Sequence, residues 1–286
     1  GRHTRKDPVG AYSQISQHQQ SWRLAGILAI ISPFMIGVFY LVITIWLFGY
    51  MSMSATGQLE YLASPKSFNE YINSPYVFVV MLLVVAIIFL ILSSGVQKGI
   101  ECAAKILMPS LFVILLVLVA FVLTLDNAAA GISFYVVPDF SKLNAGVVNG
   151  ALSQAFFSLS LGMGILITYG SYLNRKDNIV GAASMVAVAD TMVAFIAGLM
   201  ILPAVFSFNP DVNTAELSDS SVSLIFVLLP KIFLALQTTL GYFGASAVAT
   251  IFFLLVFFAA ITSLVSIIEV PVAYLIDEKG HSRKRA

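Results

Sequence analysis

The 286-residue chain is strongly apolar: 59% of its residues are hydrophobic, only 10% are charged, and its mean hydropathy is +0.95. A soluble domain carries about 25% charged residues, so the composition predicts an all-α, polytopic protein of the lipid bilayer. The net charge of +1 gives no excess of positive charge that could attract phosphate groups, which excludes nucleic acid as a partner. The single cysteine, Cys102, excludes an internal disulfide and a cysteine-rich metal site.

Six apolar stretches follow a polar, basic segment, residues 1–23, that has no signal-peptide core. Each stretch is long enough to cross about 30 Å of hydrocarbon. They span residues 24–51, 75–92, 106–125, 151–172, 183–206 and 245–276. A seventh candidate, 222–236, is shorter and contains Pro230 and Lys231. We therefore expect a re-entrant or interfacial helix there, inside an extracellular loop at 207–244.

Charge asymmetry gives the orientation of these spans. Among fifteen Lys and Arg, only Lys66, Lys142 and Lys231 fall in segments opposite the termini. The positive-inside rule then predicts that segment 1–23 and the tail 277–286 are cytoplasmic. The whole chain, 1–286, is expected to form one transmembrane domain of a cell inner or plasma membrane.

Few ionisable side chains interrupt the spans. His3, His18 and His281 all lie outside them, so no buried histidine could serve a metal or a serine nucleophile, and we expect no enzyme. Asp190 lies deep in the fifth stretch and Glu269 toward the inner end of the sixth. An ionisable residue inside a span indicates a functional site, because its burial costs at least about 2.5 kcal/mol.

Serine and glycine gather halfway along the fourth stretch, at Ser158, Ser160, Gly162 and Gly164. These residues weaken a helix where lipid offers no replacement hydrogen bonds, so an unwound segment here must line a polar cavity. Its free carbonyls could then hold a cation. Close helix packing through small residues is the alternative.

Hydroxyl groups occupy two further positions at similar depth. Ala259, Thr262 and Ser263 share one face of the sixth span, where one carbonyl and two hydroxyls could bind Na⁺. The alternative is that both hydroxyls bond to carbonyls one turn earlier. Tyr40, in the middle of the first span, needs a buried partner for its hydroxyl, which could equally be a neighbouring helix.

Four ordered motifs carry a family resemblance: GVQKGIECAAKILMP, FYVVPDFSKL, FFSLSLGMGILITYGSY and FFAAITSLVSIIEVPVAYLID. They closely resemble signature stretches of bacterial neurotransmitter:sodium symporters. The resemblance implies a LeuT-type fold with inverted repeats and one unwound helix. It covers nearly the whole chain, from the end of the family's second span to just after its eighth.

The resemblance also implies roles for individual residues. The positions that match the family's substrate pocket are Ile36, Tyr40, Phe157, Ser160, Met163, Ser263 and Ile267. One sodium ion would be held by Ser158 and Asp190, and a second by Ala259, Thr262 and Ser263. Tyr172 and Asp277 resemble parts of the intracellular gate.

Two positions depart from the family pattern. Many members carry asparagine where this chain has Asp190, and chloride-independent members often carry glutamate where it has Ala194. Gln154 and Ser158 match chloride-site positions. A fixed carboxylate at Asp190 could supply the negative charge that chloride supplies elsewhere, so we expect no chloride requirement.

These features together predict sodium-coupled symport of a neutral amino acid by alternating access, with this chain as an incomplete transporter. The apolar pocket residues Ile36, Phe157, Met163 and Ile267 favour an aliphatic or aromatic substrate. The alternatives are a ligand-binding sensor or scaffold without transport, and an ion channel.

Overall fold

The computed structural model describes residues 1–17, 19–208, 222 and 224–286; His18 and the central part of the predicted loop 207–244 lie outside them. The described residues form helices and no strand. In the first half these are α1 (Pro8–Ile15), α2 (Gln20–Ala55), α3 (Leu59–Leu62), α4 (Ser67–Ile72), α5 (Tyr76–Ser93), the π-helical turn η1 (Val96–Glu101) and α6 (Cys102–Val122). In the second half they are α7 (Ala128–Val136), the 3₁₀ turn η2 (Phe140–Lys142), α8 (Ala145–Ser158), α9 (Ile165–Tyr172), α10 (Ile179–Phe208), the π-helical turn η4 (Leu224–Leu228), α12 (Leu229–Ala235) and α13 (Gln237–Asp277).

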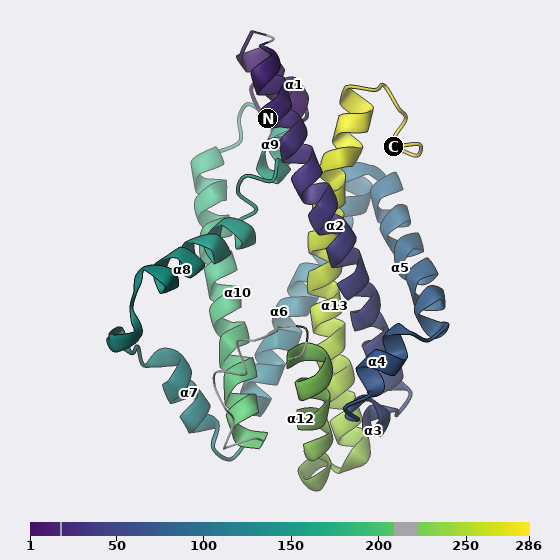
Figure 1. The fold of residues 1–286 in the computed structure, drawn as a ribbon, viewed down its shortest axis with the longest axis vertical. Helices are drawn as coiled ribbons and strands as arrows, with labels where there is room; N and C mark the ends of the chain where they lie inside the picture. Colours follow the sequence, from purple (N-terminus) through teal and green to yellow (C-terminus); the bar gives the residue numbers. More distant parts are fainter. Residues whose placement is uncertain (18, 209–221, 223) are drawn as a thin grey trace.

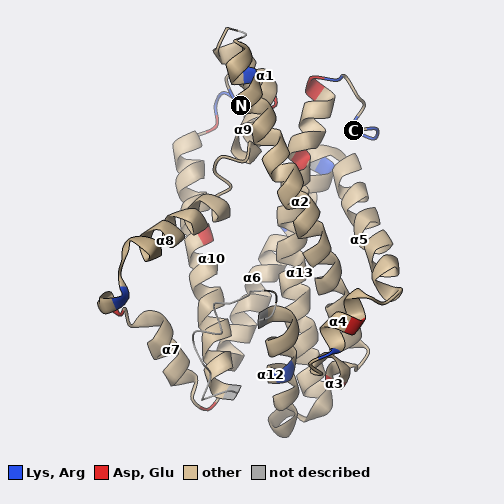
Figure 2. Ribbon diagram, viewed as in Figure 1, with Lys and Arg blue, Asp and Glu red and all other residues tan. Residues whose placement is uncertain are grey.

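Five helical segments in the described part of the chain are long and apolar enough to cross a membrane. They belong to α2, α5, α6, α10 and α13. The remaining predicted span, 151–172, is divided between α8 and α9. Figure 1 shows both chain ends at the same end of the bundle, and Figure 2 shows that charged residues gather mainly at the helix ends and in the loops.

Helices α2 and α13 form the centre of the bundle (Figure 1) and have the most extensive contact of any helix pair. Gly37 of α2 allows this approach, because a Cβ there would lie only 3.2 Å from the Ile267 side chain of α13. Small residues at such crossings let two helix backbones come close, which membrane helices need for dispersion contacts. The two helices therefore provide a rigid wall for the site described below.

Short helical segments lie inside the predicted loop 207–244. Helix α13 is bounded by Gln237, but Gly241 has non-helical φ and ψ angles of +70° and 168°, so it separates a short helical segment from the long helix, which starts close to the predicted span 245–276. The short apolar segment at 222–236 contains η4 and α12, and its residues Phe226, Leu229 and Ile232 are buried against the bundle. Tertiary contacts, which apolar length alone does not reveal, bury this segment.

An aromatic cluster holds one end of the bundle together. Tyr50 of α2 packs edge-on against Phe68, Tyr71, Phe226 and Phe253, with ring centroids 5.0–6.4 Å apart. Such edge-to-face pairs are stabilised by the quadrupoles of the rings beyond simple area burial. The cluster ties α4 and η4 to the two central helices.

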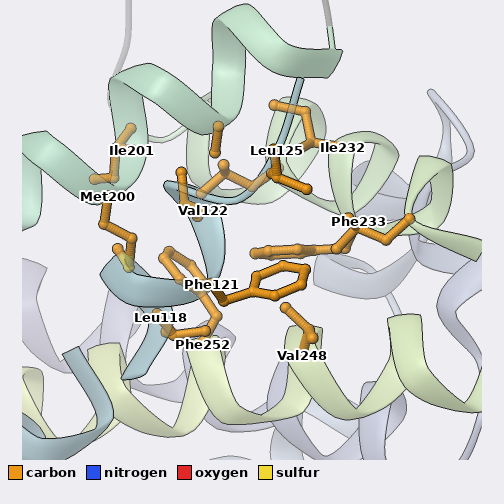
Figure 3. A pocket seen from close by; sticks show the side chains of 13 residues that line it. Leu118, Phe121, Val122, Leu125, Met200, Ile201, Ile232, Phe233, Val248 and Phe252 are labelled. Atoms are coloured by element: carbon orange, nitrogen blue, oxygen red, sulfur yellow. The ribbon is translucent and has the colours of Figure 1, made fainter. Parts of the chain in front are cut away.

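A small apolar cavity of about 20 Å³ lies between α6, α10, α12 and α13 (Figure 3). Leu118, Met200, Phe233, Val248 and Phe252 are among the residues that line it, and its lining is free of polar side chains. Side chains around such a void lose dispersion contacts, because no atom faces them on one side.

Filling this cavity should stabilise the protein. Val248→Ile adds one methylene toward it, and we expect a gain of about 0.5–1 kcal/mol in the free energy of unfolding. The same change at fully buried Val84, which lines no described cavity, should instead destabilise by about 1–3 kcal/mol through overpacking. Thermal unfolding of the purified variants in detergent measures both effects, and equal effects at the two positions would contradict the assignment.

Candidate functional site: an unwound helix facing two central helices

The fourth predicted span is unwound between Ser158 and Ile165. Ser160, Gly162 and Gly164 have φ values of +56°, +80° and +70°, in the left-handed region where a helix cannot continue. Residues 159–164 therefore separate the end of α8 from the start of α9. The last carbonyl groups of α8 bond back to this segment, because the N–H groups of Leu159, Ser160 and Leu161 donate to the carbonyls of Ala155, Phe157 and Phe156.

Gly164 fixes the break against the first central helix. Beyond its positive φ, a Cβ at this position would lie 2.7 Å from the carbonyl oxygen of Ala29 in α2. Only glycine satisfies both the conformation and the spacing. The break is therefore held against α2.

Ser158 and Asp190 meet at the α8 side of the break. The Ser158 hydroxyl lies 2.7 Å from Asp190 Oδ1 and 2.8 Å from Oδ2, so it donates to the carboxylate of α10. The hydroxyl of the adjacent Thr191 instead donates to the Ala187 carbonyl of its own helix. The pair expected to hold one sodium ion is thus close in space, next to the negative end of the α8 dipole, which favours a cation.

Tyr40 reaches across from α2 toward α13, where its hydroxyl lies near the Ser263 side chain. The side chains of Ile36, Met163 and Ile267 belong to one apolar cluster together with Tyr40. Five of the seven expected pocket residues therefore lie together, contributed by two central helices and the unwound segment. This arrangement combines an apolar wall with hydroxyl groups at one edge.

The two remaining pocket candidates are arranged differently. Phe157 is 45% exposed near the end of α8 and does not join the apolar cluster. Ser160 lies in the break itself, with its backbone N–H bonded to the Phe157 carbonyl. Both flank the cluster rather than complete its packed wall.

The second expected sodium site lies on α13. The Thr262 hydroxyl bonds to the Phe258 and Ala259 carbonyls at 3.1 and 3.0 Å, so the back-bonding alternative holds for this residue. Ser263 instead contacts Tyr40. The three oxygen groups remain on one helix face, with the Ala259 carbonyl accepting from the Thr262 hydroxyl.

A buried acid lies near the C-terminal end of α13. Glu269 is fully buried, accepts a hydrogen bond from the Tyr172 hydroxyl at 2.5 Å, and forms an ion pair with Arg283. Arg283 also donates from Nε to the Leu92 carbonyl at the end of α5, at 2.8 Å. One carboxylate thus joins α9, α13 and the tail, and the tail is tied in turn to α5.

Asp277 lies at the end of the same helix but in a different contact. Its Oδ2 accepts a hydrogen bond from the backbone N–H of Asp7 at 2.9 Å. Asp7 in turn caps α1 through Val9 and Gly10, and burial raises the pKa of its carboxyl although these two N–H donors oppose the shift. The two expected gate residues, Tyr172 and Asp277, therefore contact different partners.

Sequence reasoning singled out Glu269 without assigning it a partner, and it overlooked Arg283. A signal was present, because a buried acid about two turns before the end of a span requires a compensating cation. Arg283 follows only fourteen residues later, beyond the helix end. Its role depends on the tail folding back, which the linear sequence does not reveal.

Comparison with known proteins agrees with this geometry. Residues 70–286 match the family model described as the sodium:neurotransmitter symporter family. The crystal structure of MhsT in complex with L-phenylalanine superposes with a TM-score of 0.80 and is 38% identical, covering 100% of this chain and 63% of that one. The match confirms the expected LeuT-type fold.

Relatives with curated sequences give the same result. YhdH, an uncharacterized sodium-dependent transporter of Bacillus subtilis, is 34% identical over 289 residues, covering 100% of this chain and 61% of the relative. A sodium-dependent nutrient amino acid transporter 1 of Drosophila ananassae is 29% identical over 196 residues, covering 67% of this chain and 30% of that protein. The chain thus spans about three fifths of the length of its bacterial relative. This multi-pass membrane chain belongs to the sodium:neurotransmitter symporter family.

Proposed function

We propose that the full-length protein containing this chain couples the inward movement of Na⁺ to uptake of a neutral amino acid by alternating access. The observation that supports this proposal is the apolar cluster beside the helix break, which contains Ile36, Tyr40, Met163 and Ile267. Its apolar wall suits an aliphatic or aromatic side chain, and the Tyr40 and Ser263 hydroxyls suit a carboxylate. MhsT, the related structure, was solved with L-phenylalanine.

In this proposal, two groups of oxygen atoms near the apolar cluster would each hold one sodium ion. One would bind Ser158 and Asp190 at the break, and the other Ala259, Thr262 and Ser263 on α13. Hard cations prefer such carboxylate, carbonyl and hydroxyl oxygens. Because Asp190 already supplies a negative charge, the site needs no chloride to balance Na⁺.

The inner gate would consist of Tyr172, Glu269, Arg283 and Asp277. Their contacts join α9, α13, α1 and the tail, so opening toward the cytoplasm requires that some of them separate. This assignment puts both ends of the chain on the cytoplasmic side of the plasma or inner membrane. It also keeps 207–244 on the outer side.

Sodium-driven uptake distinguishes transport from the two other candidate functions. Full-length protein in proteoliposomes should accumulate a labelled neutral amino acid only with an inward Na⁺ gradient. Sodium-dependent binding without accumulation would indicate a sensor or scaffold, and conductance without saturation would indicate a channel.

Removing the hydroxyls of the α13 site should abolish sodium-dependent binding. Thr262→Val with Ser263→Ala deletes two cation ligands, and we expect at least about a hundredfold loss of apparent Na⁺ affinity. Thr250→Val is the matched control, because Thr250 lies on the same helix and bonds only to the Ser246 carbonyl. Substrate binding titrated against Na⁺ measures the change, and an unchanged affinity in the double variant would refute the site.

Replacing Asp190 tests the charge balance. The parent protein should transport equally in chloride and gluconate, whereas Asp190→Asn should either fail or gain stimulation by chloride, since its fixed charge is gone. Thr191→Val serves as control because its hydroxyl bonds within α10. A chloride-dependent parent would rule the proposal out.

A double-mutant cycle tests the buried pair of the inner gate. Glu269→Gln or Arg283→Gln alone leaves a charge without its partner and should cost about 3–5 kcal/mol, whereas the double variant should recover most of this loss. The exposed pair Glu101 and Lys105 is the control and should show no measurable coupling. Unfolding of full-length variants in denaturant gives the coupling energy, and additive effects at 269 and 283 would contradict the pair.

A further inference from the structure

Helix α9 contacts α13 through two tyrosines, and one of them has no role in the gate proposed above. Tyr172 donates its hydroxyl hydrogen to the Glu269 carboxylate. Tyr169, three residues earlier, donates to the Ser266 hydroxyl, with 3.1 Å between the two oxygens. Side chains three positions apart lie on the same side of a helix. The two hydrogen bonds therefore join the same pair of helices about one turn apart.

Ser266 connects Tyr169 to the residues proposed to bind the second sodium ion. The Ser266 hydroxyl donates its one hydrogen to the Thr262 carbonyl at 3.1 Å, so it acts as the acceptor toward Tyr169. The Thr262 hydroxyl bonds in the same way to the carbonyls of Phe258 and Ala259. Such bonds to the preceding turn bend a helix, so they set the backbone curvature where the proposed sodium ligands lie. Tyr169 thus holds the side chain at the C-terminal edge of this stretch.

The hydroxyl of Tyr169 adds a constraint that its ring does not need. The ring packs against an apolar cluster that contains Ile165, Ile267 and Val270, and a phenylalanine could make the same contacts. Among the residues that the structure describes, the Tyr169 hydroxyl bonds only to Ser266. A hydroxyl shielded from water costs free energy when it loses its partner. Movement of α9 away from α13 therefore has to break a bond that the packed arrangement supplies.

We propose that the Tyr169–Ser266 hydrogen bond couples the inner gate to the sodium site on α13, an inference that rests on the function proposed above. Tyr169 and Tyr172 belong to the same eight-residue helix, so a gate opening that separates Tyr172 from α13 also pulls Tyr169 away from Ser266. Closure then fixes the curvature of the sodium-binding stretch, and bound Na⁺ favours closure in return, because coupling between two sites is reciprocal. Neither side chain is assigned to bind Na⁺ or substrate, so both are positioning residues.

Position 266 allows a substitution that separates the hydroxyl from the shape of the side chain. Ser266 lines a cavity of about 50 Å³ between α5, η1, α6 and α13, so one additional methyl group has room there. Ser266→Thr keeps the hydroxyl, whereas Ser266→Val has nearly the same shape and lacks it. Tyr76→Phe is the matched control for Tyr169→Phe, because the Tyr76 hydroxyl also pairs with a serine, Ser52, at 2.8 Å, but between α5 and α2.

Substrate binding by the full-length protein, titrated against Na⁺, tests the coupling. Tyr169→Phe and Ser266→Val should each weaken the apparent Na⁺ affinity about three- to tenfold, which is the effect of one hydrogen bond. The double variant should lose no more than Ser266→Val alone, because both changes delete the same bond. Ser266→Thr and Tyr76→Phe should match the parent, and at saturating Na⁺ every variant should bind substrate with the affinity of the parent. Additive losses in the double variant, or equal affinities in Ser266→Thr and Ser266→Val, would contradict the proposal.

Hydrogen exchange of the full-length protein measures the gate itself. Na⁺ at constant ionic strength should slow amide exchange in residues 165–172 of the parent. Tyr169→Phe should lose most of this protection even when Na⁺ saturates the variant, a result that weaker sodium binding alone cannot produce. Undiminished protection in Tyr169→Phe would overturn the coupling alone. A parent without sodium-dependent substrate binding would overturn the proposed function and this inference with it.

Discussion

The constraint on which the structure depends is the absence of water inside the bilayer. Every backbone polar group there must be satisfied within the protein, so a helix can be interrupted only where the freed groups have another partner. At the break after Ser158, the N–H groups of Leu159, Ser160 and Leu161 find such partners in carbonyls of the last turn of α8. The break is held against α2 at Gly164, and Asp190 lies at its α8 end. The candidate site exists because an interruption at this depth requires polar surroundings.

The same constraint explains the two buried or half-buried acids. Asp190 contacts one neutral hydroxyl, which leaves room for a cation, whereas Glu269 is already paired with Arg283 and Tyr172. A carboxylate without a counter-charge is suited to bind an ion that comes and goes. A carboxylate with a fixed counter-charge is suited to hold helices together. The two acids therefore differ in their partners, although both interrupt apolar stretches.

Close backbone approach links the separate sites. Gly37 lets α13 pack on α2 beside the apolar cluster, Gly164 fixes the break against α2, and Gly26 fixes α1 to the same helix. Helix α2 is thus the common support for α13, the break and α1.

The sequence alone determined the helical class, the location of the spans and the position of the break, because apolar length and clustered glycine and serine act locally. It also identified, through resemblance to a family, residues such as Tyr40, Met163 and Ile267 that the fold brings together. It did not determine the partners of Glu269 and Asp277 or the burial of α12. Those features arise from contacts between residues far apart in the chain, such as Asp7 with Asp277. Only the tertiary structure decides which of these distant groups meet, because a local sequence pattern carries no information about how the chain ends fold back.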